Sequence, residues 1–303
     1  MSPPQIAVAS EVMRTTGWAD YALLDSGHGR KLEQYGPYKV VRPEPQCLWS
    51  PRLPQDVWDA ADAVFDPSDE EDAGRWRFKA GPVESWPLGW GDVKFHGRFT
   101  AFRHLAFFPE QAANWGWLDT QVRSMGPNAD GGPARVLNLF GYTGVASLVM
   151  AAAGAAVTHV DASKKAVAWA RENAELSRLS DRPVRWIVED AKKYVQREVR
   201  RGSTYEGIIL DPPKYGRGPD GQVWRLFEDL PEMASLCAQL LSADAKFLVL
   251  NAYAERISGA ALAGLLAEKL EARGGRIEWG ELALEEQRGD RAIGMSFFAR
   301  WSR

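Results

Sequence analysis

A chain of 303 residues with 45% hydrophobic and 25% charged residues can bury a large core and has the composition of a globular protein. Its formal net charge of -3 provides no overall basic surface, so a nucleic-acid partner would require a local basic patch. Cys47 and Cys237 are too few for a disulfide framework or a cysteine metal cluster, and we expect no metal.

The first residues lack a basic-then-apolar signal pattern, and no apolar stretch approaches the length of a membrane span. These two observations predict a cytoplasmic protein without a membrane partner. Residues 1–104 show no helical periodicity. They contain short β-favouring runs separated by turn residues, at 21–24, 38–41, 76–79 and 93–102. This pattern predicts a small β-rich N-terminal domain over 1–104.

The same region is rich in tryptophan. Such rings could stack on unpaired bases, but in a small β domain they more often supply core and interface area. Between Met1 and Arg103 there are 12 Lys/Arg and 15 Asp/Glu, so the region is not a basic arm. The tryptophans are Trp18, Trp49, Trp58, Trp76, Trp86 and Trp90.

From residue 105 onward the pattern changes to alternating helices and strands. A helix is predicted from 107, because Pro109 and Glu110 suit a first turn and apolar residues recur at helical spacing as far as Met125. Strands are then predicted at 136–140, 157–160, 184–188, 207–210, 246–250, 276–284 and 294–300. Alternation of this kind predicts an α/β domain over 105–303, with a Rossmann-like, seven-stranded, mostly parallel sheet. The closing hairpin would supply one antiparallel strand.

A glycine turn follows the first strand of this domain. Gly141 and Gly144 permit a tight turn before an alanine-rich helix, and Asp161 lies about 20 residues further on, where nucleotide-binding sheets place a ribose-binding carboxylate. A dinucleotide site normally has the pattern G-x-G-x-x-G, whereas these glycines are spaced G-x-x-G. The spacing favours a ligand with a ribose and no pyrophosphate, such as S-adenosylmethionine. A purely structural turn is the alternative.

Acidic residues also end the later strands. Asp161, Asp190 and Asp211 should lie at one edge of the sheet with the glycine turn, because the carboxyl ends of parallel strands meet there. Asp161 would accept the ribose hydroxyls, and Asp190 would accept from an adenine amine. Each acid could instead be an ordinary helix N-cap. Phe140 and Tyr142 would place aromatic rings near a sulfonium.

The segment Asp211-Pro212-Pro213-Lys214-Tyr215 follows a buried strand directly. Its two prolines prevent continued strand pairing and hold the backbone extended and rigid. Such a segment can direct a carboxylate and main-chain carbonyls at a planar polar group. The alternative is a stiff strand-to-loop turn.

From residue 107 onward the sequence resembles the class I S-adenosylmethionine-dependent methyltransferases, and among them the ribosomal-RNA large-subunit methyltransferases of the I and K types. The motifs that carry the resemblance are FPEQ at 108–111, NLFGYTG at 138–144, VDAS at 160–163, EDA at 189–191 and DPPKY at 211–215. The resemblance implies that residues 211–215 face the methyl acceptor as the catalytic set. It implies that the cofactor is bound by Phe108, Gln111, Asn138, Phe140, Gly141, Tyr142, Thr143, Gly144, Asp161, Ala162, Ser163, Asp190, Ala191 and Asp211.

One departure from this family bears on the chemistry. Members that methylate carbon 5 of cytosine use a cysteine nucleophile just beyond the fifth strand, where this chain has Asn251-Ala252-Tyr253. Together with the resemblance, this departure predicts S-adenosylmethionine-dependent methylation of RNA at a nitrogen, without covalent attack. RNA is the expected partner, and a homodimer is one possible assembly. The alternatives are a small-molecule or protein acceptor, or a cofactor-binding module without activity.

Overall fold

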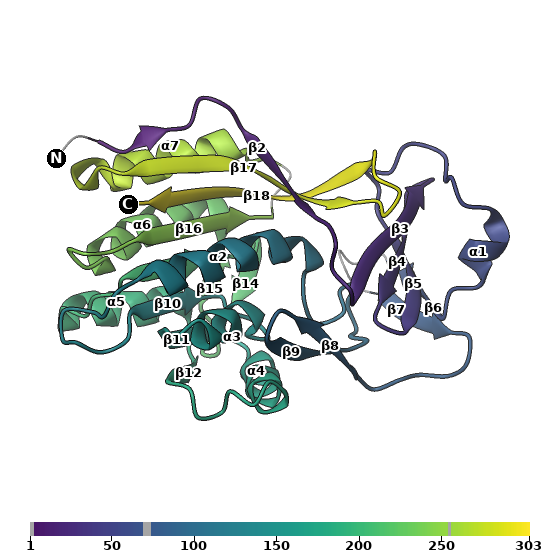
Figure 1. Cartoon of the computed structure of the whole chain (residues 1–303), viewed down its shortest axis with the longest axis horizontal. Helices are drawn as coiled ribbons and strands as arrows, with labels where there is room; N and C mark the ends of the chain where they lie inside the picture. The colour runs from purple at the N-terminus through teal and green to yellow at the C-terminus, as the bar shows by residue number, and fades with distance from the viewer. Residues whose placement is uncertain (1–2, 69–73, 254–255) are drawn as a thin grey trace. The chain divides into compact units, whose positions relative to one another are not determined.

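The structure is a computed structural model that describes residues 3–68, 74–253 and 256–303 (Figure 1). Its contacts group the chain into two compact units. The α/β unit comprises Met1–Met13, Asn114–Leu282 and Ser296–Arg303, and the β unit comprises Arg14–Ala113 and Ala283–Met295. Each unit is thus assembled from separate stretches of chain. The predicted domains 1–104 and 105–303 would need only one boundary, and that division stays a prediction.

The central sheet of the α/β unit has the strand order β1-β17-β18-β16-β13-β10-β11-β12, and β2 also pairs with β17. All neighbours from β16 to β12 pair in parallel, whereas β18 pairs antiparallel to β16. This confirms a mostly parallel sheet with an antiparallel strand. Its strands are β1 (Gln5–Ile6), β2 (Glu11–Thr15), β10 (Arg135–Leu139), β11 (Ala156–Asp161), β12 (Val184–Val188), β13 (Gly207–Leu210), β16 (Phe247–Ala252), β17 (Arg276–Glu285) and β18 (Ala292–Ser302).

The strands β1 and β2 extend the predicted seven-stranded sheet to nine strands, although the sequence pattern assigns their residues to the N-terminal β-rich domain. They cover the edge of β17, which would otherwise present unpaired backbone groups. Trp279 Nε1 donates to the Ala7 carbonyl at 2.8 Å. Gly280 allows the Glu11 carbonyl to approach closely, because a Cβ at this position would overlap it. Strands this short show too little alternation to be assigned to a sheet from sequence.

Helices cover both faces of this sheet (Figure 1). Within the strands, Leu137 and Leu139 pack in one buried cluster with residues of α5, α6 and α7, whereas Val136 packs in another with residues of α2 and α3. Alternate residues of one strand therefore fill two separate cores, as expected for a parallel sheet that is buried on both sides. The helices are α2 (Ala112–Ser124), α3 (Val145–Ala152), α4 (Lys164–Leu176), α5 (Ala191–Arg201), α6 (Leu226–Leu240) and α7 (Gly259–Lys269), with 3-10 turns η1 (Pro109–Gln111) and η2 (Glu271–Arg273).

One helix start differs from the predicted position. The helix expected from 107 begins with the 3-10 turn η1, and α2 itself starts at Ala112. Helix α6 starts at Leu226. The residues before α6 form a small hairpin, in which β14 (Tyr215–Arg217) pairs antiparallel with β15 (Val223–Arg225). The sequence pattern does not predict this pairing.

The β unit contains a five-stranded sheet in the order β3 to β7 and a separate hairpin of β8 and β9. This confirms an additional β-rich region. None of the six tryptophans between Trp18 and Trp90 is exposed. Trp58 and Trp86 are buried and the other four are half-buried, which favours a packing role over stacking platforms on the surface. The elements are β3 (Tyr21–Gly27), β4 (Arg30–Tyr35), β5 (Tyr38–Pro43), α1 (Gln55–Asp59), β6 (Ala63–Pro67), β7 (Gly74–Phe78), β8 (Trp86–Trp90) and β9 (Val93–Gly97).

A buried ion cluster joins β3, β4 and β5. The Glu33 carboxylate, fully buried, accepts from Arg42 Nε and Nη2 at 2.7 Å, from the Tyr21 hydroxyl at 2.9 Å and from the Tyr35 hydroxyl at 3.0 Å. Burial opposes ionisation of Glu33, but the charges of Arg42 and Lys31 outweigh it and lower its pKa to about 2. Because each group satisfies the others, the cluster fixes the register of these strands.

Candidate cofactor and acceptor site

The turn after β10 has a strained backbone. Phe140 and Tyr142 adopt left-handed conformations with φ of 58° and 49°, and Gly144, with φ of 81°, is the N-cap of α3. A bulky residue in this region costs on the order of 1–3 kcal/mol, and such strain concentrates at functional sites. The turn places the first amides of α3 at the carboxyl edge of the sheet, where an anion or polar ligand can accept from them.

Both glycines of the turn are required by the protein's own packing. A Cβ on Gly141 would lie 2.5 Å from Cε1 and Nδ1 of His159, and a Cβ on Gly144 would lie 2.8 Å from Cβ of Ala170. The sequence predicts that these glycines permit a tight turn. In the structure they also allow the turn to pack against β11 and α4.

We expect Gly141→Ala to destabilise the protein. The added methyl group would meet the buried His159 ring, and overpacking of this kind costs about 1–3 kcal/mol of unfolding free energy. Gly264→Ala is the matched control, because Gly264 lies in α7 and a Cβ on it would have no atom within 4 Å beyond its chain neighbours and the adjacent helix backbone. Alanine there should leave stability unchanged or raise it by up to about 1 kcal/mol. Urea titrations of both variants test this, and equal stabilities would contradict it.

Beneath the turn lies a chain of buried polar side chains. Asn138 Nδ2 donates to Ser147 Oγ at 2.8 Å, and Ser147 Oγ lies 3.0 Å from His159 Nδ1. All three residues are buried, and they join β10, α3 and β11. Sequence motifs singled out Asn138 as a cofactor ligand but not Ser147 or His159. In the sequence, Ser147 and His159 stand out only as a hydroxyl and an imidazole within otherwise apolar segments.

The burial of His159 predicts acid sensitivity. Burial lowers its pKa from 6.5 to about 3, so between these values the unfolded chain binds a proton that the folded protein does not. Unfolding free energy should therefore fall as pH is lowered through this window. In His159→Gln we expect a slope that is shallower by up to about 1.4 kcal/mol per pH unit, measured by urea titration at several pH values. His28→Asn, at an exposed position, is the control. An unchanged slope in His159→Gln would contradict the assignment.

Asp161 ends β11 and is linked to the turn. Its Oδ2 accepts from the Tyr142 amide and its Oδ1 from the Ser163 amide, both at 2.8 Å. Burial raises the pKa of Asp161, and the two amide bonds oppose that shift. An ionised carboxylate has about four acceptor positions, so Asp161 can hold the turn and still accept from two ribose hydroxyls. Ala162 and Ser163 follow, and Ser163 Oγ caps α4 through the Ala166 amide at 3.2 Å.

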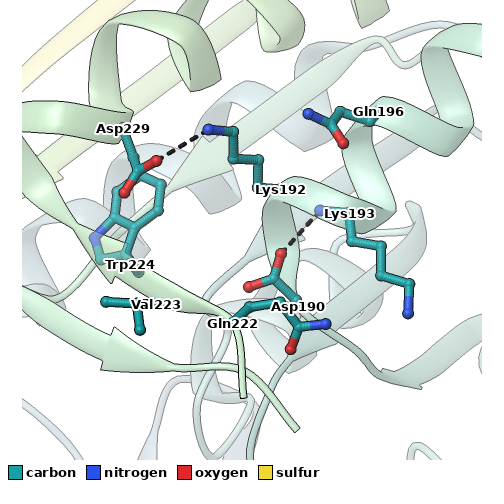
Figure 2. Close-up of a pocket in the computed structure, with 8 residues that line it drawn as sticks. All are labelled: Asp190, Lys192, Lys193, Gln196, Gln222, Val223, Trp224 and Asp229. Atoms are coloured by element: carbon teal, nitrogen blue, oxygen red, sulfur yellow. Dashed lines mark hydrogen bonds and ion pairs between the residues drawn. The ribbon is translucent and has the colours of Figure 1, made fainter. Parts of the chain in front are cut away.

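Asp190 is the N-cap of α5, where its Oδ1 accepts from the Lys193 amide at 2.9 Å (Figure 2). Ala191 is buried in the first turn of the same helix. Asp190 is therefore a helix N-cap, as the alternative interpretation predicts. The capping hydrogen bond uses only one of its two carboxylate oxygens. The expected contact of the other oxygen with an adenine amine stays a prediction.

A polar pocket of about 310 Å³ adjoins Asp190 (Figure 2). Lys192 on its wall forms ion pairs with Asp229 at 2.9 Å and Glu232 at 2.6 Å, so its charge is compensated. The pocket is lined by residues of α5, the hairpin and α6, namely Asp190, Lys192, Lys193, Gln196, Gln222, Val223, Trp224 and Asp229. It offers hydrogen-bonding groups without a strong local charge, which suits a neutral heterocycle better than a phosphate.

The segment from Asp211 to Tyr215 follows β13 at the same sheet edge. The Asp211 amide donates to the Leu139 carbonyl at 3.5 Å. Trp224 Nε1 donates to the Pro213 carbonyl at 2.8 Å, and its ring lies 5.0 Å from that of Phe140. Pro212 is buried, whereas Pro213, Lys214 and Tyr215 are exposed. The hairpin and the glycine turn thus hold the proline segment between them.

The order β13-β10-β11-β12 places the ends of four adjacent strands in a row. The glycine turn, Asp161, Asp190 and Asp211 follow those strand ends directly, so they gather at one edge as the sequence predicts. Phe108 and Gln111 belong to the β unit. Gln111 is buried there, and its amide donates to the Phe108 carbonyl at 3.1 Å. A cofactor role for these two residues stays a prediction.

The cysteines are far from nucleophilic. Cys237 lies inside α6, where burial raises its pKa to about 12, and burial raises that of Cys47 to about 11. Asn251, at the end of β16, is buried and accepts from Asn114 Nδ2 at 3.0 Å. Within 3–68, 74–253 and 256–303, no group of His, Cys, Asp or Glu is arranged to hold a metal ion. No helix in these ranges is long and apolar enough to span a membrane.

The residues present suit an adenosyl cofactor. A strained turn after β10 leads into the N-terminus of α3. The Asp161 carboxylate, which can accept from ribose hydroxyls, ends β11. A polar pocket lies beside Asp190, which follows β12. With the rigid Asp-Pro-Pro segment on the neighbouring strand, this fold and site define a class I S-adenosylmethionine-dependent methyltransferase.

Comparisons with known proteins agree with this class. A family model described as "Conserved hypothetical protein 95" matches residues 114–232. The crystal structure of a SAM-dependent methyltransferase from Agrobacterium tumefaciens is 50% identical, superposes with a TM-score of 0.94, and the match covers 99% of this chain and 96% of that one. A candidate SAM-dependent methyltransferase from Streptococcus mutans shares the fold, with a TM-score of 0.70 at 15% identity over 94% of this chain and 76% of that one. The protein belongs to the SAM-dependent methyltransferases.

Curated relatives match a shorter segment. A ribosomal RNA large subunit methyltransferase K/L from Shewanella sp. (strain ANA-3) is 36% identical over 33% of this chain and 15% of its own length. A ribosomal RNA large subunit methyltransferase I from Shewanella frigidimarina is 41% identical over 26% of this chain and 20% of its own length. The chain therefore spans only about a fifth or less of these relatives.

Proposed function

We propose that the protein transfers the methyl group of S-adenosylmethionine to a nitrogen atom of RNA. The observation that carries the choice of nitrogen is the chemistry of the sheet edge. The end of β16 holds the buried amide of Asn251, and both cysteines are buried with raised pKa values. Attack on carbon 5 of a pyrimidine requires an accessible thiolate, whereas a nitrogen carries its own lone pair.

When bound, S-adenosylmethionine supplies a methyl group activated by a sulfonium. The protein's part is to align the acceptor nitrogen with that group and to accept its proton. Asp211 is the group that we assign to accept an N–H of the acceptor amine. The Pro213 carbonyl is already bonded to Trp224, and this bond fixes the segment that carries Asp211. Alignment of two reacting groups supplies much of the rate of such transfers.

The choice of RNA is supported by the names of the two Shewanella relatives, whose matches cover 33% and 26% of this chain. The net charge of -3 requires that any RNA contact be local. A protein or small-molecule acceptor is the second candidate, favoured by the packed rather than exposed tryptophans of the β unit. For an RNA acceptor, the cytoplasm is the compartment that we propose.

The test uses labelled S-adenosylmethionine with RNA, protein and metabolite fractions from cells that lack the protein. We expect label in RNA, released by ribonuclease, and an N-methylated nucleoside on mass spectrometry. Label in the protein or metabolite fraction would replace RNA by the second candidate. A carbon-methylated base would remove the nitrogen assignment. Cofactor binding without labelling of any fraction would indicate an inactive module.

A further inference from the structure

The hairpin of β14 and β15 has two different faces. Gly216 pairs with Trp224, and the Trp224 side chain is buried against Phe140 and the Pro213 carbonyl. In an antiparallel pair, residues directly opposite each other point to the same face, and the flanking pairs point to the other. The outer face, defined by the flanking pairs, therefore comprises Tyr215 with Arg225 and Arg217 with Val223.

This outer face is open to solvent. Tyr215 is 50% exposed and Val223 48% exposed, and the Arg225 side chain is 58% exposed. The face therefore presents an aromatic ring and an apolar side chain next to two guanidinium groups. Arg217 Nε donates to the Tyr215 hydroxyl at 3.3 Å, so the ring and the cation are held side by side.

Among the described residues, the nearby acids compensate the charge of Arg225 but not that of Arg217. Asp220, in the hairpin turn, pairs with Lys193 at 3.1 Å, and Asp229 pairs with Lys192 at 2.9 Å. Glu228 lies 3.5 Å from Arg225, with both side chains exposed. In the described part of the chain no carboxylate lies within 4.0 Å of the Arg217 guanidinium. The outer face therefore retains positive charge on a protein whose total charge is negative.

We propose that this outer face binds unpaired RNA next to the nucleotide being methylated. The proposal rests on RNA being the acceptor and adds the surface that holds it. An exposed aromatic ring stacks on an unpaired base of any sequence, and an arginine fork fits a phosphate. A duplex keeps its base faces inside the stack, so the ring selects single-stranded segments. An acidic protein partner would use the arginines without the ring.

The hairpin is a suitable platform because it is fixed before RNA arrives. Trp224 connects it to the glycine turn and to the proline segment, and the ion pair of Lys193 with Asp220 joins its tip to α5. Tyr215 lies only four positions after Asp211. A base stacked on Tyr215 would therefore set the neighbouring nucleotide near the Asp211 carboxylate, with little loss of loop entropy.

The test measures binding of a fluorescent, unpaired RNA of about 12 nucleotides by anisotropy at several salt concentrations. Arg217→Ala should lower affinity and reduce the salt slope by about 0.7, the value for one phosphate contact on a single strand. Tyr215→Ala should lower affinity by about tenfold, whereas Tyr215→Phe, which keeps the ring, should stay within about twofold of the original protein. Arg276→Ala removes an exposed arginine in β17 and should change neither affinity nor slope.

Two outcomes would overturn the proposal. If Arg217→Ala and Tyr215→Ala bind RNA as Arg276→Ala does, the outer face is not the RNA surface, even where the labelling experiment finds methylated RNA. If Tyr215→Phe loses as much affinity as Tyr215→Ala, stacking on the ring is wrong. Label in protein instead of RNA would show that RNA is not the acceptor. That result comes from the labelling experiment and not from the binding measurement, so the two failures can be told apart. Calorimetry with S-adenosylmethionine on Arg217→Ala verifies that the protein is folded and binds its cofactor.

Discussion

Asp161→Ala is expected to weaken S-adenosylmethionine binding by about tenfold or more. The change removes the acceptor for two ribose hydroxyls and also releases the Tyr142 and Ser163 amides that the carboxylate holds at 2.8 Å. Asp161→Asn should lose nearly as much. Both oxygens now face backbone N–H groups, and the side-chain amide would turn a donor towards one of them. Isothermal titration calorimetry measures both affinities.

Asp181→Ala is the matched control, because Asp181 is an exposed acid in the loop between α4 and β12. Its affinity should equal that of the original protein. Thermal unfolding of Asp161→Ala shows whether the loss of the amide bonds unfolds the protein or only the site. If the folded Asp161→Ala protein binds the cofactor normally, the assignment of the ribose to Asp161 is wrong.

Asp211→Asn should reduce methyl transfer by about 100-fold or more, the range for loss of a positioned proton acceptor. Cofactor affinity should stay within a few-fold of the original value, because we place Asp211 towards the acceptor. Turnover is followed with labelled cofactor on the fraction that the original protein methylates, and affinity is followed by calorimetry. The separation of turnover from affinity is the expected signature of a residue that acts only on the acceptor.

Asp244→Asn provides the control for Asp211→Asn, since Asp244 is exposed in the loop before β16. It should retain both turnover and affinity. The resemblance placed Asp211 among both the catalytic and the cofactor-binding residues, and the same pair of measurements decides between them. If affinity and turnover fall together in Asp211→Asn, Asp211 belongs to the cofactor site.

The sequence predicted the α/β sheet well because its strands are buried on both faces and read as short apolar runs, as at 207–210. It failed where a strand is too short to show a period, as at β1, and where glycines mask strand pairing, as in the hairpin after Tyr215. The interleaving of the two units also has no local signal. It depends on contacts between segments that lie far apart in the chain.

The candidate site was predictable at the strand ends, because topology alone brings Asp161, Asp190 and Asp211 to one edge. The side chains that support the turn and the proline segment at this edge were not predictable. The imidazole against which Gly141 packs and the indole that bonds the Pro213 carbonyl come from residues 18 and 11 positions away, respectively. Single-sequence patterns identify which residues end a strand, but not which distant side chain supports them.

The interleaved course of the backbone has a practical consequence for transplanting parts between relatives. The β unit is made of Arg14–Ala113 and Ala283–Met295, so the chain enters and leaves it twice. A chimaera with a single junction at residue 104 would combine most of Arg14–Ala113 from one parent with Ala283–Met295, the tip of the β17–β18 hairpin, from the other. A workable exchange therefore replaces both segments of the β unit at once, with a junction at each of their four ends.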